Sequence, residues 1–193
     1  MKKSLIAIAA LAATGAFAQS SVTLYGVADL SLAKASGVST QLSGNGTLNN
    51  GGSRFGLRGT EDLGGGLKAN FNFEAGVNAE TGATDASTFQ RAAWAELAGN
   101  FGSVRLGRTL TPSFYGVTAW ELTGAANYSV VASQFSVAGS GSRNNSQISY
   151  TTPKMSGFSG TLGYINKADN LVSGSAASWS ATNPSIFTPA VAA

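Results

Sequence analysis

The side chains with the most distinctive placement in this sequence are its arginines. All six lie within or at the ends of expected β-strands, and none lies in an expected turn; they are Arg54, Arg58, Arg91, Arg105, Arg108 and Arg143. A guanidinium group keeps its charge at any working pH. The arginines therefore predict a fixed array of positive charge and not a site for proton transfer.

The groups that most enzymes use for catalysis are missing from the sequence. It contains no histidine and no cysteine, which excludes thiolate nucleophiles, imidazole bases and the common zinc sites. Acidic residues are scattered, without the spacing of a calcium loop, and the glycine runs at 51–52 and 64–66 lack the lysine of a phosphate-binding loop. We therefore expect no enzyme activity, no cofactor and no metal site.

The overall composition is unusual for a soluble domain. Of 193 residues only 11% are charged, against about 25% in ordinary soluble domains. The 12 basic and 9 acidic residues give a net charge of +3, which is too small and too evenly mixed to indicate a nucleic acid partner. The 25 glycines and only 4 prolines are typical of strands joined by turns.

The N-terminal residues have the features of a secretory signal peptide. Lys2 and Lys3 precede an uninterrupted apolar run at residues 5–16, and Ala16-Phe17-Ala18 is a cleavage motif. We therefore expect residues 1–18 to be removed and residues 19–193 to form the mature chain. That chain has no further apolar run of about 18 residues, so only strands could span a membrane.

The expected strands are recognised by apolar and polar residues that alternate with a period of two. The clearest runs from Leu67 to Asn78, where twelve consecutive positions alternate without error. A tilted strand needs about 10 to 12 residues to cross a bilayer. The other alternating segments are 22–32, 54–60, 89–97, 103–108, 143–152 and 158–165.

The links between these strands alternate between long and short. The long links are 33–53, 79–88 and 109–142, and the short ones are 61–66, 98–102 and 153–157. Bacterial outer-membrane barrels have short periplasmic turns and long extracellular loops. The sequence therefore predicts an all-β fold, an antiparallel transmembrane β-barrel.

The alternative is a soluble β-sandwich, acting as a secreted or surface-exposed, adhesin-like structural protein without a pore. Its outer faces would be rich in Lys and Glu, whereas the polar faces here carry mostly Asn, Ser, Thr and Gly, as a water-filled lumen requires. An outer-membrane enzyme would need a nucleophile and a base, and without histidine the only candidates are scattered serine, lysine and carboxylate side chains. Aromatic residues suited to membrane interfaces favour the barrel; they are Tyr25, Phe71, Phe73, Trp94 and Tyr150.

Three segments resemble, in order, the general trimeric porins of Gram-negative β-proteobacteria. They are SVTLYGVAD at 21–29, SRFGLRGTEDLGGGLKA at 53–69 and FGSVRLGR at 101–108. The resemblance covers most of residues 1–167. It implies an outer-membrane barrel of sixteen strands that assembles as a homotrimer and lets ions and small hydrophilic solutes diffuse through a lumen narrowed by the third extracellular loop.

Strand parity indicates which charged side chains would line that lumen. An arginine facing lipid at the midplane costs about 2 to 4 kcal/mol, so the polar face must point inward. Arg91 also faces inward if Trp94 faces lipid, which leaves Glu96 pointing outward. Arg108 has the opposite parity, and we expect a bulge at Gly107 to turn it inward. The remaining polar-face residues are Arg54, Arg58, Lys68, Glu74, Arg105 and Arg143.

Residues 109–142 follow the fifth expected strand, so the resemblance makes them the third extracellular loop. The segment is too apolar for an exposed loop and needs a surface to pack against, which the inner barrel wall would supply. Glu121 is its only charged residue. By the resemblance, this carboxylate faces basic residues of the wall.

These features predict an outer-membrane porin with a weak preference for anions. Residues 168–193 form an atypical tail, because Pro184 and Pro189 interrupt the place of a final membrane strand. Seven expected strands would leave two open edges, which hydrocarbon does not tolerate. We therefore expect an incomplete barrel that forms no trimers or channels when expressed alone; a small closed barrel is the alternative.

Overall fold

The computed structural model describes residues 20–34, 36–37, 39–44, 46, 48–135, 142–166 and 185–192. The expected signal peptide, residues 1–18, lies outside the described residues, as do residues 167–184 and 193 of the tail. Within the described ranges, no helix is long and apolar enough to cross a membrane.

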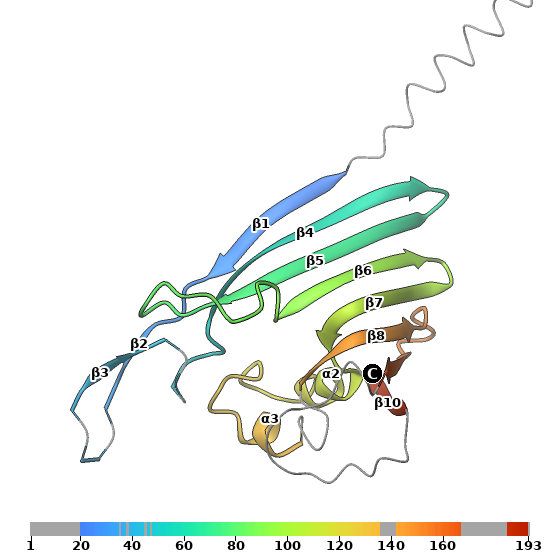
Figure 1. Ribbon diagram of the computed structural model, residues 1–193. Coiled ribbons are helices and arrows are strands. Elements are labelled where there is room, and N and C mark those ends of the chain that lie inside the picture. The colour runs from blue at the N-terminus through green and yellow to red at the C-terminus, as the bar shows by residue number, and fades with distance from the viewer. Residues whose placement is uncertain are drawn as a thin grey trace, which may run out of the picture.

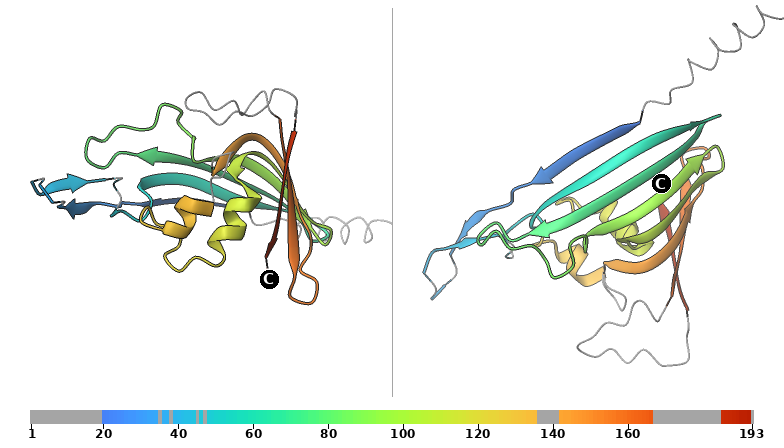
Figure 2. Two further views of the ribbon diagram at one scale, coloured as in Figure 1. Left: turned by 90° about the horizontal axis from the view of Figure 1, so that it is seen from below. Right: turned by 45° about the horizontal axis from the view of Figure 1, so that its top comes forward.

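The main element is one antiparallel sheet of eight strands (Figure 1). Its curvature turns the last strands across the direction of the first (Figure 2). This all-β antiparallel architecture confirms the fold class expected from the alternating sequence. In order across the sheet, the strands are β1 (Ser21–Val27), β4 (Ser53–Gly64), β5 (Leu67–Val77), β6 (Ala92–Gly99), β7 (Gly102–Leu110), β8 (Arg143–Thr151), β9 (Ser159–Asn166) and β10 (Ser185–Ala192).

One face of the sheet is apolar and exposed. Leu24 lies opposite Leu57, which lies opposite Phe73, so the apolar positions of neighbouring strands form continuous rows. Leu24 is 72% exposed and Leu106 is 51% exposed. A soluble sandwich would bury such rows against a second sheet, whereas this face is suited to contact with hydrocarbon.

The first strand ends earlier than the alternating sequence predicts. We expected it to continue to Leu32, but β1 ends at Val27, and β2 (Ser31–Ala33) pairs with β3 (Gln41–Ser43) in a separate small sheet. Asp29 ends the strand, because its backbone N–H donates to the hydroxyl of Ser53 and its carboxylate accepts from the next loop. These side-chain contacts compete with continued strand pairing.

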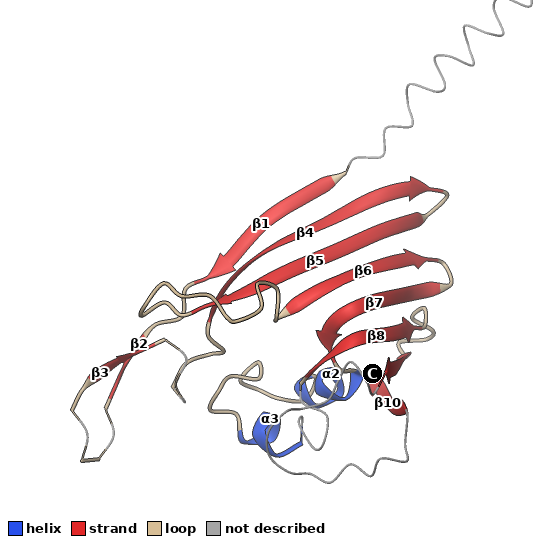
Figure 3. Ribbon diagram, in the orientation of Figure 1, coloured by secondary structure: helices blue, strands red, loops and turns tan. Residues whose placement is uncertain are grey.

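Two short helices lie within the segment 109–142, which we expected to be the third extracellular loop (Figure 3). They are α2 (Pro112–Thr118) and α3 (Val130–Phe135). The hydroxyl of Thr111 caps α2 by accepting a hydrogen bond from the backbone N–H of Phe114 at 3.1 Å, and Pro112 is suited to the first helical turn.

The tail also contributes a strand, so the sheet has one more strand than the seven we expected. β10 pairs with β9 alone, and Pro189 lies opposite Leu162. Proline lacks a backbone N–H but is tolerated in an edge strand, whose outer side makes no ladder bonds. Pro189 therefore does not prevent strand pairing, and Pro184 lies outside the described residues.

Candidate functional site

The polar face of the sheet brings together side chains from five strands. Thr23 of β1 lies opposite Arg58 of β4, and Arg58 lies opposite Asn72 of β5. The same row continues to Trp94 of β6, which lies opposite Gly107 of β7. Because side chains alternate along each strand, Thr23, Arg58, Asn72 and Trp94 project from one face. Arg105 of β7 lies on the same face, against the ring of Trp94.

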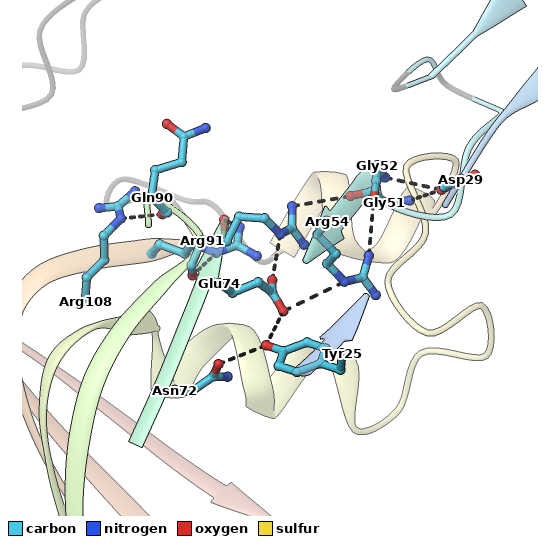
Figure 4. A network of polar contacts seen from close by, with 12 residues as sticks. Tyr25, Asp29, Gly51, Gly52, Arg54, Asn72, Glu74, Gln90, Arg91 and Arg108 are labelled. Carbon is cyan, nitrogen blue, oxygen red and sulfur yellow. Dashed lines mark hydrogen bonds and ion pairs between the residues drawn. The ribbon is translucent and has the colours of Figure 1, made fainter. Parts of the chain in front are cut away.

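Glu74 is the centre of an ionic cluster on this face (Figure 4). Its carboxylate accepts a hydrogen bond from Nε of Arg91 at 2.7 Å and lies 3.9 Å from Nε of Arg54. The hydroxyl of Tyr25 donates to the same carboxylate at 2.8 Å and lies 2.9 Å from Oδ1 of Asn72. One carboxylate thus serves two arginines and a tyrosine.

Backbone carbonyl groups hold the guanidinium groups in place. Arg54 donates to the carbonyl of Gly52 at 3.1 Å, and Arg91 donates to that of Gly51 at 3.4 Å. Arg143 donates through Nε to the carbonyl of Arg91 at 2.8 Å. Neutral acceptors orient these groups without cancelling their charge, so the cluster stays positive.

A second ion pair lies nearer the short turns. Glu96 and Arg105 are direct partners in the β6–β7 register, with Nη2 of Arg105 at 2.7 Å from the carboxylate. The guanidinium also lies over the ring of Trp94, 4.0 Å from its centroid, which is a favourable cation–π contact. Arg105 is therefore fixed on two sides.

This arrangement corrects the expected orientation of β6. We expected Trp94 to face lipid and Glu96 to point outward, but both lie on the face of Arg105. Arg91 precedes the strand, which begins at Ala92, so its direction does not follow the alternation of β6. The direction of the Arg91 side chain therefore does not depend on which face Trp94 occupies.

Arg108 lies at the rim of the sheet. The expected bulge is present, since the β7–β8 register shifts between Gly107 and Thr109 and Gly107 has a φ of 122°. Arg108 nevertheless remains opposite Ala93, a residue of the apolar face, because the β6–β7 register is unbroken. Its guanidinium contacts the carbonyl of Gln90 and Oδ1 of Asn145, which are loop-side groups.

Arg58 and Lys68 have surroundings different from those of the paired arginines. Arg58 is exposed, and its guanidinium lies 5.2 Å from the centroid of the Tyr25 ring. Lys68 is exposed beside a short turn, opposite Asp62 and Ala98. Both are therefore accessible to solutes along the polar face, Arg58 within β4 and Lys68 beside the short turn.

Among the residues that the structure describes, Glu121 forms no ion pair with the basic wall residues that we expected it to face. Its carboxylate instead accepts bonds from the backbone N–H of Ala125 at 2.6 Å, and from the hydroxyl and backbone N–H of Thr123 at 2.7 and 2.8 Å. These hydrogen bonds lower the pKa of the Glu121 carboxyl from 4.5 to about 2, and the bond from the Ala125 N–H has the largest effect. The carboxylate thus stabilises its own loop.

Helix α2 covers part of the polar face and encloses a cavity of about 390 Å³. Both helices lie on one side of the sheet (Figure 2). The cavity is lined by Pro112, Tyr115 and Gly116 on the helical side and by Glu96, Arg105 and Gln147 among the wall residues. Gln147 is 2% exposed and its Oε1 has no partner among the described residues, which is typical of a cavity that holds water.

Sequence reasoning missed several residues of this site. Tyr25 was assigned to the polar face but interpreted as an interface aromatic, and Asn72 and Gln147 were not singled out. The strand alternation could have identified all three, because each lies on the polar face of its own alternating segment. Their partners, by contrast, lie on strands distant in the sequence.

The chain is similar in sequence to known bacterial outer-membrane proteins. Residues 4–185 match the family model described as Gram-negative porin. The chain is 45% identical over 175 residues to outer membrane porin protein 32 of Delftia acidovorans, covering 85% of this chain and 49% of that protein. It is 33% identical over 178 residues to major outer membrane protein P.IB of Neisseria gonorrhoeae, covering 86% and 49%.

A solved structure shows the same architecture. The anion-selective porin from Comamonas acidovorans superimposes with a TM-score of 0.59 at 34% identity, covering 78% of this chain and 48% of that one. The present chain therefore spans about half the length of these relatives.

Proposed function

This chain belongs to the family of Gram-negative porins, proteins of the outer membrane, and we propose that the complete protein forms a water-filled channel that favours anions. Ions and small hydrophilic solutes would cross it by diffusion. The fixed charges act without a chemical step, so the function needs neither an enzyme mechanism nor a cofactor.

The observation that supports the anion preference is the imbalance of charge on the polar face. Arg54, Arg91 and Arg105 pair with glutamates, while Arg58 faces a tyrosine ring. Arg143 adds a further guanidinium group beside the cluster. Positive charge in excess along a narrow aqueous path concentrates anions and depletes cations.

We propose that the segment 109–142 is the constriction of this channel. Its helix α2 lies over the polar face, across a cavity from Arg105. The lining of the narrow region then consists of Arg54, Arg58, Arg91, Arg105, Arg143 and Glu74. Arg108 would stand at the loop-side mouth and Lys68 at the mouth beside the short turns, while Glu121 would shape the constriction from within its own loop.

The outer surface supports a further part of the proposal, that the complete protein is a homotrimer in lipid. Exposed apolar rows such as that of Leu24 and Leu57 would contact hydrocarbon or a neighbouring subunit. Contiguous exposed apolar patches mark surfaces that contact another protein or a membrane. Trimers that resist detergent in unheated gels are the expected result.

The test is the reversal potential of the complete protein in planar bilayers that separate unequal KCl concentrations. We expect a weak to moderate preference for chloride, and a shift toward potassium on Arg58→Glu or Arg105→Glu. Lys154→Glu, an identical charge change in the exposed turn 153–157, is the matched control and should change little. A strong cation preference of the unmodified protein, or membrane insertion without conductance, would refute the proposal.

A further inference from the structure

The tip of the proposed constriction, residues 121–129, is hydrogen-bonded to Gly46, Asn49 and Asn50 of the first long loop, the link at 33–53. The backbone N–H of Asn127 donates to the carbonyl of Asn49 at 3.1 Å, and its Nδ2 donates to the carbonyl of Gly46 at 3.0 Å. The hydroxyl of Tyr128 lies 3.3 Å from Oδ1 of Asn50. Three contacts therefore join segments that lie 78 to 81 residues apart in the sequence.

Asn49 is the buried centre of the first long loop, at 1% exposure. Its Nδ2 donates to Oδ1 of Asp29 at 3.0 Å and to the carbonyl of Ser43 at 3.2 Å. Its Oδ1 accepts from the hydroxyl of Ser43 and the backbone N–H of Gly46, both at 2.9 Å. Both ends of the amide are used, so the carbonyl groups that receive the tip have a fixed position.

The same loop also orients the arginines. The carboxylate of Asp29 accepts from the backbone N–H groups of Gly51 at 3.0 Å and Gly52 at 3.2 Å (Figure 4). The carbonyl groups of these two glycines are the acceptors of Arg91 and Arg54. A continuous set of hydrogen bonds therefore runs from the tip through Asn49 and Asp29 to the guanidinium groups.

The tip is able to transmit this constraint because it is internally rigid. The carboxylate of Glu121 binds the N–H groups of Thr123 and Ala125, and Ala125 has a left-handed φ of 59°. Ala126 is buried at 2% exposure and accepts the N–H of Ser129 at 2.8 Å. These bonds hold the tip in one closed conformation.

We propose that Asn49 is a positioning residue that holds the constriction tip and the arginine cluster in one frame. Pore width and anion preference are then set together by a loop side chain that no permeating solute touches. This inference rests on the proposed channel function. It predicts that release of the tip raises conductance and lowers selectivity in the same event.

The first arm of the test compares two variants of the complete protein by single-channel recording. Asn127→Ala removes the bond to Gly46 but keeps the backbone bond, and loss of one hydrogen bond should raise the undocked population about fivefold. Asn49→Asp places a carboxylate beside Asp29 and should give a larger effect. Both should show added levels of higher conductance with weaker anion preference, whereas Asn100→Ala, in an exposed short turn, should not.

The second arm restores the contact by a covalent bond. The chain contains no cysteine, so Asn50→Cys and Tyr128→Cys can be joined specifically by a short, reducible bifunctional thiol reagent in the Asn127→Ala background. Cross-linking should return the channel to one conductance level and to the unmodified reversal potential, and reduction should reverse both changes. A purely structural role for these residues would not give this reversible rescue.

The outcomes separate the two proposals. If the unmodified protein conducts and the Asn127→Ala and Asn49→Asp channels keep its conductance and selectivity while only their thermal stability falls, the positioning role is refuted. If the unmodified protein inserts but does not conduct, the channel function itself fails. Asn127 is exposed, so the Asn127→Ala protein should fold and can still be tested if Asn49→Asp does not fold.

Discussion

Replacing Glu74 by glutamine tests directly whether the polar face controls ion selectivity. Glutamine has the shape of glutamate, and its Oε1 can still accept from Nε of Arg91, now 2.7 Å from the carboxylate, or from the hydroxyl of Tyr25. The substitution therefore removes one negative charge from among Arg54, Arg91 and Arg143 with little change in packing. We expect a stronger preference for anions.

The size of the effect follows from Coulomb's law. For an ion about 6 Å from the carboxylate in water, one unit charge contributes about 0.7 kcal/mol. At about 0.1 M salt, with a Debye length of about 10 Å, screening reduces this to about 0.4 kcal/mol. The energy of an ion in the channel falls by this amount for an anion and rises by the same amount for a cation. The ratio of chloride to potassium permeability should therefore increase about fourfold. At about 1 M salt the change should nearly vanish.

The measurement is the reversal potential in asymmetric KCl, at low and at high mean salt concentration. Asp62→Asn removes the same charge near the short turn, six residues along β4 from the residue paired with Glu74, or about 20 Å away. It should leave the low-salt reversal potential close to that of the unmodified protein. An unchanged potential for Glu74→Gln at low salt, or a shift toward cations, would refute the reasoning.

Two further predictions concern stability and pH. Gly107→Ala should lower the thermal midpoint and reduce the free energy of unfolding by about 1 to 3 kcal/mol, because the φ of 122° is left-handed and a Cβ would meet the carbonyl of Ala93. Gly160→Ala is the control, since a Cβ at that position meets open space. Equal melting temperatures of the two variants would contradict this prediction. The pKa of Glu121 is lowered from 4.5 to about 2, so its bonds stabilise the tip fully above pH 4.5 and are lost as pH falls toward 2. The protection of the Ala125 amide, its exchange rate relative to the intrinsic rate at the same pH, should report this loss. Glu121→Gln should abolish the pH dependence of this protection; an unchanged protection profile in that variant would exclude the carboxylate as its cause.

Local alternation determined the strands and much of the polar face. The segment from Leu67 to Val77 forms β5 as predicted, and Arg54 and Arg58 lie on the face that their parity indicates. The bulge at Gly107 was also predictable, since glycine tolerates the backbone conformation that a bulge requires. These features depend on residues that are near one another in the sequence.

The interactions that organise the candidate site were decided by tertiary structure. The direction of Glu96 depends on its pairing with Arg105 across β6 and β7, and the end of the first strand depends on Asp29 meeting a loop more than 20 residues away. The role of Glu121 depends on a loop closure that alternation does not describe. Period-two patterning specifies which side of a strand a residue occupies, but only the folded chain brings distant hydrogen-bonding groups within 3 Å or so of one another, and those contacts select the conformation of the loops.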